Sequence, residues 1–141
     1  MPTITLNTQH LQCDIRPDLG GCIAGLWYNN TPVLRSTQGD DLQTVRLCAS
    51  FPMVPYSNRQ AFAKMQWSGE THALTPNFDP EPHAIHGAGW ERPWQVQGST
   101  ATQATLHLQH TPDARWPFAF EATQTITLQD DALTLQMAVT N

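Results

Sequence analysis

The sequence predicts an all-β fold, an antiparallel β-sandwich in a single domain over residues 1–141. Apolar residues recur at every second position along much of the chain, which places alternate side chains on opposite faces of a strand, and a helical period is hard to find. Turn-forming residues recur at short intervals between these segments, which favours a sandwich over an α/β fold. A chain of 141 residues is enough for one core but too short for two domains of ordinary size.

The N-terminal part predicts short strands separated by tight turns. The strands are expected over residues 3–6, 11–15, 23–28 and 33–34. The turns between them are marked by glycine, asparagine and proline, at Gly20-Gly21, Asn29-Asn30 and Pro32. Each of these turns favours a reversal of the chain, so that neighbouring strands can pair.

The C-terminal part predicts three consecutive strands that form a meander. Residues 104–109 alternate between apolar and polar side chains, and a turn follows at 110–113, where a proline removes a backbone donor. A hairpin is expected over residues 118–141, with a polar turn at 129–131. Its last strand is predicted to be half-buried, with an apolar face formed by Leu133, Leu135, Met137 and Val139.

The middle of the chain, from about residue 50 to residue 93, differs in kind from both ends. It is rich in Pro, His, Trp and Asn, and it has little periodicity beyond a short hairpin pattern over residues 63–74. Long irregular connections in a chain of strands are usually functional or disordered, and the tryptophans argue against disorder. We therefore expect the functional residues in this segment.

Charge and composition exclude several classes of partner. With 12 acidic and 7 basic residues the formal charge is −5, and the basic residues are dispersed, so nucleic acid is not an expected partner. The start lacks a secretory signal pattern, and no stretch approaches the roughly 18 apolar residues of a membrane span. We expect a soluble, cytoplasmic protein. Its cysteines lack a CxxC spacing and are expected as buried, reduced thiols at Cys13, Cys22 and Cys48.

Residues 51–59 form the first candidate element of a site. Two prolines fix backbone angles in this segment, and Ser57-Asn58 supplies turn chemistry that can hold Arg59 in one direction. A prepositioned arginine suits sugar hydroxyls, because its planar fork offers several donors and stays charged. Flat apolar faces for a sugar ring could come from Tyr56, Trp67, Trp90 and Trp94. The alternative is that Arg59 pairs with a surface carboxylate and that the aromatic residues belong to the core.

Residues 83–90 form the second candidate element. His83 and His86 stand three apart, a spacing that would share one face of a helix and could bind a metal. No helix is predicted among these prolines and glycines, and no third ligand has suitable spacing, so no metal is expected. His86 before Gly87 is better interpreted as a neutral, hydrogen-bonding imidazole, with the glycine giving a ligand access to the backbone. The alternative is a loop histidine that backbone carbonyls satisfy.

Together these segments resemble the sugar-handling loops of the aldose 1-epimerase (galactose mutarotase-like) family. The features that carry the resemblance occur in the family's order: an Asn-Arg pair after a proline and an aromatic residue, a His-Gly loop, a Trp-Pro-Phe element at 116–118 and a closing hairpin. The resemblance covers most of the chain. It implies the family's large antiparallel β-sandwich and a cofactor-free interconversion of the α and β anomers of an aldose.

The resemblance also implies roles for individual residues. Arg59 is similar to the family's sugar-binding arginine, and His86 is similar to its first histidine, which contacts the sugar and serves catalysis. Asn58 and Trp90 are expected to contact the sugar beside them. The His-Gly-Ala-Gly-Trp loop differs from the His-Gly-Gly of other members, which leaves the identity of the sugar open.

The family's second histidine, its acidic sugar-binding residue and its glutamate base would fall beyond Asn141. The chain is therefore expected to be the N-terminal part of a mutarotase-like sandwich, with an open sheet edge at its last strand. Two hypotheses follow. In one, an aldose 1-epimerase receives its acid and base from a further portion or another chain. In the other, a β-sandwich binds carbohydrate or associates with itself, as a homo-oligomer, without catalysis.

Overall fold

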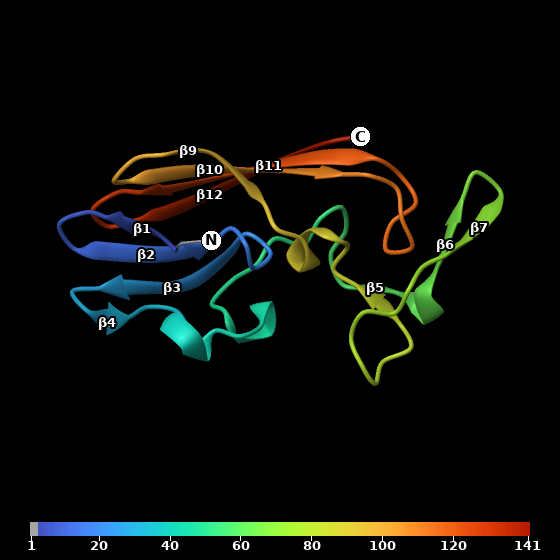
Figure 1. Cartoon of the computed structure of the whole chain (residues 1–141), viewed down its shortest axis with the longest axis horizontal. Coiled ribbons are helices and arrows are strands. Elements are labelled where there is room, and N and C mark those ends of the chain that lie inside the picture. The colour runs from blue at the N-terminus through green and yellow to red at the C-terminus, as the bar shows by residue number, and fades with distance from the viewer. Residues whose placement is uncertain (1–2) are drawn as a thin grey trace.

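Two four-stranded antiparallel sheets face each other in a computed structural model that describes residues 3–141 (Figure 1). The first sheet has the strand order β1-β2-β3-β4, with β1 Ile4–Asn7, β2 Leu11–Arg16, β3 Cys22–Tyr28 and β4 Thr31–Pro32. The second has the order β12-β11-β10-β9, with β9 Gln95–Ser99, β10 Gln103–His110, β11 Phe120–Leu128 and β12 Leu133–Thr140. The predicted all-β antiparallel sandwich is thereby confirmed.

The middle of the chain lies beyond one end of the two sheets, at the right of Figure 1. It holds two small antiparallel pairs, β5 Arg59–Gln60 with β8 Ala84–Ile85, and β6 Lys64–Trp67 with β7 Glu70–Ala73. The remaining regular elements are single 3₁₀ turns, η1 Gly39–Asp41, η2 Val45–Leu47, η3 Ala61–Ala63 and η4 Gly89–Glu91. Over residues 3–141, no helix has the length and apolar character that crossing a membrane requires.

Most predicted strands are present, and the differences have local causes. The fourth strand lies at Thr31–Pro32, before the predicted residues 33–34, because Asn29 and Asn30 take φ angles of 47° and 64° and turn the chain at once. Strand β9 was not predicted. All of its residues are exposed, so it has no buried alternation to detect, and it forms by pairing with β10.

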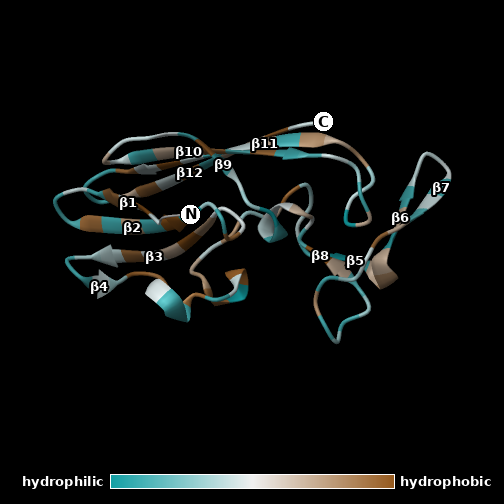
Figure 2. Ribbon diagram, in the orientation of Figure 1, coloured by the Kyte–Doolittle hydropathy of each residue, from teal (hydrophilic) through white to brown (hydrophobic). Residues whose placement is uncertain are grey.

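The main core fills the space between the two sheets. Its fully buried side chains come from both layers and include Leu6, Ile15, Leu106, Ile126 and Trp94. Figure 2 shows apolar residues along β2 and β3 on the sheet that faces the second layer. A second cluster, which contains Cys22, Cys48 and Trp90, joins β3 to the loops of the middle segment. The cysteines are free and buried, as predicted.

Strand β12 departs from its predicted burial. It pairs with β11, but Leu135, Met137 and Val139 of its apolar face are 49%, 40% and 47% exposed. These residues stand opposite buried residues of β11, so they share the core-facing side of the sheet. The prediction of a half-buried strand was wrong because the facing sheet ends at β1, which contacts β10. Among residues 3–141, β12 has β11 as its one strand neighbour, so its outer edge is open, as expected.

Candidate functional site

The two candidate segments meet in the short β5–β8 pair. Arg59 stands opposite Ile85, and the backbone N–H of His86 donates to the carbonyl oxygen of Asn58 at 2.9 Å. The backbone N–H of Asn58 in turn donates to Nδ1 of the His86 ring at 3.0 Å. Residues 28 positions apart are therefore held side by side, and Asn58, Arg59 and His86 form one constellation.

Backbone geometry forces the His86 turn. His86 and Gly87 take φ angles of 60° and 70°, in the left-handed region that residues other than glycine seldom adopt. The next two backbone N–H groups, of Ala88 and Gly89, donate to the carbonyl oxygen of Val54 at 2.9 and 3.0 Å. A Cβ atom at position 87 would lie 2.1 Å from that same oxygen. Glycine is thus required at position 87 by backbone packing against the first candidate segment.

The hydrogen bond from Asn58 determines which nitrogen of the His86 ring carries the proton. Because a backbone N–H can only donate, Nδ1 is the acceptor, and the neutral ring carries its proton on Nε2. Burial lowers the pKa of His86, and the charge of Arg59 lowers it further. The ring is therefore the neutral imidazole that the sequence predicts, with Nε2–H as its donor. The ring nitrogen is satisfied by a backbone N–H rather than by a carbonyl.

Arg59 forms a two-pronged ion pair with Glu81. Its Nε donates to Oε2 at 2.7 Å and its Nη2 to Oε1 at 2.6 Å, while Nη1 donates to Oδ1 of Asn58 at 3.2 Å. The hydrogen bond from Arg59 lowers the pKa of Glu81. The side chains are 48% and 29% exposed. This is the surface carboxylate pairing that the sequence left as an alternative, and it also holds the guanidinium in one orientation.

Trp90 lies beneath the His86 loop, only 3% exposed. Its Nε1 donates to the carbonyl oxygen of Gly87 at 3.2 Å, and its ring stacks on Phe51 at 5.4 Å. The His86 ring meets Trp90 edge-on at 6.2 Å and lies 5.8 Å from Phe51. Trp90 therefore supports His86 from below in this structure, and its expected contact with a sugar stays a prediction.

The other aromatic candidates lie elsewhere. Trp94 is fully buried in the main core, as the alternative interpretation expected. Trp67 is 64% exposed on the β6–β7 hairpin. Tyr56 is partly buried, and its ring lies 5.3 Å from that of Trp116. Burial raises the pKa of the Tyr56 hydroxyl, so it stays protonated at neutral pH.

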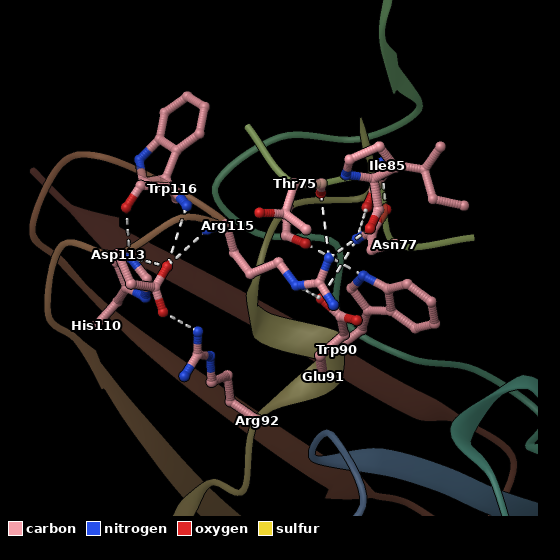
Figure 3. Close-up of polar contacts among 12 residues, drawn as sticks. Thr75, Asn77, Ile85, Trp90, Glu91, Arg92, His110, Asp113, Arg115 and Trp116 are labelled. Carbon is pink, nitrogen blue, oxygen red and sulfur yellow. Dashed lines mark hydrogen bonds and ion pairs between the residues drawn. The ribbon is translucent and has the colours of Figure 1, made fainter. Parts of the chain in front are cut away.

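A polar network that sequence reasoning missed holds Ile85, the residue that precedes His86 (Figure 3). The Asn77 side chain binds both backbone groups of Ile85: the Ile85 N–H donates to its Oδ1 at 2.8 Å, and its Nδ2 donates to the Ile85 carbonyl oxygen at 2.9 Å. Nδ2 also lies 3.3 Å from a carboxylate oxygen of Glu91. That oxygen pairs with Nε of Arg115 at 3.1 Å, and Arg115 donates to the carbonyl oxygen of Pro76 at 2.7 Å. No local signal marks these residues, because their partners are distant in sequence.

The loop after β10 completes the network (Figure 3). Oδ1 of Asp113 accepts the backbone N–H groups of Arg115 and Trp116 at 2.9 and 3.2 Å, and Oδ2 accepts a hydrogen bond from Arg92. These contacts and the charge of Arg92 lower the pKa of Asp113 against the opposing effect of its burial. Nε2 of His110, which is 4% exposed, lies 2.9 Å from the carbonyl oxygen of Trp116. The buried imidazole of His110 therefore anchors this loop.

The two histidines of the second segment do not converge on a common point. Nδ1 of His83 accepts the backbone N–H of Phe62 at 2.9 Å, while Nδ1 of His86 accepts that of Asn58. Within residues 3–141, no three His, Cys, Asp or Glu side chains are grouped so that they could hold a metal ion.

Comparison with solved structures places the fold among galactose mutarotase-like β-sandwiches. A structure from Escherichia coli K12, described as a candidate aldose 1-epimerase, matches with a TM-score of 0.89 and 29% identity. The matched region covers 99% of this chain and 46% of the Escherichia coli chain. A GalM/aldose epimerase homologue from C. elegans matches with a TM-score of 0.81 and 20% identity, over 99% of this chain and 46% of that one.

The chain belongs to the aldose 1-epimerase family, whose model matches residues 2–141. Among curated proteins it is 32% identical to the uncharacterised protein YphB of Escherichia coli K12, over 141 residues. That match covers 100% of this chain and 47% of YphB. The chain thus spans about half the length of the relatives that it matches.

Proposed function

We propose that this chain takes part in the interconversion of the α and β anomers of a hexose by acid–base ring opening. Membership of the aldose 1-epimerase family supports the reaction class. The observation that carries the proposal is the reciprocal pairing of Asn58 with His86, which sets Arg59 and a neutral imidazole beside each other at the surface. Asn58, Arg59 and His86 would contact the sugar, with Trp90 beneath them.

The reaction needs an acid that protonates the ring oxygen and a base that takes the proton of the anomeric hydroxyl. A neutral His86 with its proton on Nε2 suits donation of a hydrogen bond to a sugar oxygen, and Arg59 suits hydroxyl binding. One imidazole cannot serve both oxygens at once. The second acid–base group would therefore come from residues outside these 141, in a further portion of the protein or in another chain.

Binding and catalysis can be tested separately on this chain. We expect α-galactose or α-glucose to shift the NMR signals of Asn58, Arg59 and His86, and we expect Arg59→Gln and His86→Gln to weaken that response about tenfold or more. Arg16→Gln is the matched control, because Arg16 forms a similar two-pronged pair with Asp18 at 2.8 Å on β2. An unchanged affinity in Arg59→Gln would remove Arg59 from the site.

Polarimetry on the same samples measures anomer interconversion. Faster mutarotation of galactose or glucose that is lost in His86→Gln supports the enzyme. Binding by these 141 residues without acceleration fits both candidates, because the second acid–base group is taken from outside them. If a sample extended past Asn141 also binds without acceleration, the second candidate is supported, a carbohydrate-binding sandwich that associates with itself. The exposed apolar face of β12 suits a second copy of the chain, as this second candidate requires, and it equally suits a further portion of the protein, as the first requires.

A further inference from the structure

We propose that Glu81 is a specificity-determining residue that reserves the site for uncharged sugars and excludes sugar phosphates and sugar acids. This inference rests on the proposed function above and concerns the chemical class of the substrate. The guanidinium of Arg59 already binds a carboxylate along its Nε–Nη2 edge, one of the edges through which arginine binds anions.

The Glu81 carboxylate occupies the positions that a ligand anion would take. Arginine recognises phosphate and carboxylate groups through two parallel N–H donors, and here Nε and Nη2 of Arg59 both donate to Glu81, at 2.7 and 2.6 Å. A phosphate that approached Arg59 would have to displace a group that is tethered to the same surface. It would also meet the negative charge of Glu81, which is a repulsive element against the wrong ligand.

The backbone of the loop fixes the position of Glu81. Glu81 lies between Pro80 and Pro82, and its backbone N–H donates to the carbonyl oxygen of Phe78 at 2.8 Å. The ring of Phe78 lies 3.9 Å below the guanidinium of Arg46. Since both neighbours of Glu81 are prolines, the backbone that presents its carboxylate to Arg59 has restricted freedom.

What remains at the surface suits sugar hydroxyls, which both donate and accept hydrogen bonds. Three of the five N–H donors of Arg59 are used by Glu81 and Asn58, so donors remain on its terminal nitrogens. Each Glu81 oxygen keeps capacity to accept, and His86 offers its Nε2–H. The Arg59–Glu81 pair has no net charge. Donors and acceptors of this mixture match neighbouring hydroxyls of an uncharged sugar.

The experiment compares galactose, galactose 6-phosphate and inorganic phosphate on the wild-type chain and on Glu81→Gln, with the Arg59 Nε–H and His86 signals as NMR readouts. We expect wild type to bind galactose 6-phosphate about tenfold or more weakly than galactose, and Glu81→Gln to lose or reverse this difference. Inorganic phosphate should shift the Arg59 signal in Glu81→Gln only. Glu70→Gln is the matched control, because Glu70 is 78% exposed on β7, 4.0 Å from His72, and should behave as wild type.

The outcomes separate this inference from the proposed function. Equal binding of the two sugars by wild type would overturn the role of Glu81, as would a Glu81→Gln protein that still excludes phosphate. In both cases a galactose response leaves the proposed sugar site in place. A wild-type chain that ignores galactose counts against the proposed function, whereas a phosphate response confined to Glu81→Gln still supports exclusion of anions by Glu81.

Discussion

His86 combines a left-handed backbone, a buried ring face and a ring nitrogen bound to the backbone of another segment. Left-handed φ angles are uncommon outside glycine, and they cost about 1–3 kcal/mol unless the surroundings hold them. Here the cost is offset by the two hydrogen bonds with Asn58, which itself has a φ angle of 63°. Two non-glycine residues in uncommon conformations, Asn58 and His86, thus lie together with Gly87 at the candidate site.

The protonation of His86 gives a pH prediction. Because its pKa in the folded chain lies below the ordinary value of 6.5, the unfolded chain takes up a proton first as the pH falls. The stability from the neutral ring is therefore fully present above about pH 6.5, and it is lost as the pH falls towards the folded pKa. NMR titration of the ring should give a midpoint below 6.5. Arg59→Gln should raise that midpoint by removing the smaller cause, and a wild-type midpoint above 6.5 would contradict the assignment.

Gly87→Ala should destabilise the chain by about 3 kcal/mol, because the new methyl group would press on the carbonyl oxygen of Val54 in a strained backbone region. Chemical denaturation measures the change. Gly98→Ala is the control, since a Cβ atom there meets nothing within 4 Å, and it should change the free energy of unfolding by less than about 1 kcal/mol. Equal effects of the two substitutions would show that the turn relaxes freely.

At the scale of elements, the site depends on a two-residue strand. β8 is too short to be stable alone, and its pairing with β5 is equally brief. The side chain of Asn77 forms hydrogen bonds with both the backbone N–H and the carbonyl oxygen of the second residue of β8, Ile85. Asn77 is in turn linked through Glu91 to Arg115. His86 follows directly, so a side chain outside the site determines where the imidazole lies.

Asn77→Ala should therefore cost about 2–3 kcal/mol in the free energy of unfolding, because two backbone groups of a buried residue lose their partners. Urea denaturation and the NMR signal of the Asn58 N–H should report the change together, the latter through loss of its bond to His86. Gln66→Ala is the control, since that amide donates to Thr71 on an exposed hairpin, and about 0.5 kcal/mol is expected. A mild effect of Asn77→Ala with an intact Asn58 signal would show that β5 alone positions His86.

At the scale of the whole molecule, the two sheets overlap incompletely. The first sheet covers the core-facing side of β10 and β11, whereas β12 lies past the edge of that sheet and its apolar side is uncovered. Leu135, Met137 and Val139 are each at least 40% exposed in consecutive positions on that side. An apolar strand at an open edge is a surface on which chains associate.

Replacement of Leu135, Met137 and Val139 together by threonine should reduce both the binding of a hydrophobic dye and any concentration-dependent association in analytical ultracentrifugation. Stability should change by only about 1 kcal/mol, since the three side chains are already partly exposed. Val33→Thr, at a residue 55% exposed near the first sheet, is the control and should leave dye binding unchanged. Undiminished dye binding in the triple variant would place the adhesive surface elsewhere.

The local pattern of the chain determined most of its strands and the two segments of its candidate site. Alternation with period two and asparagine or glycine turns act between near neighbours, so the strands around Leu11 and Leu106 and the hairpin ending at Asn141 could be read in order. The Asn58-Arg59 and His86-Gly87 pairs are also local signals, and the structure brings them together.

Only the tertiary structure decided which groups these residues meet. Three contacts join residues that no periodicity in the sequence relates. They are the ion pair of Arg59 with Glu81, the packing of Trp90 under the His86 loop and the hydrogen bonds of Asn77 to Ile85. Exposure of β12 likewise depends on where the opposite sheet ends. Burial and ion pairing arise from contacts between distant segments, and such contacts leave no spacing in the sequence from which they could be predicted.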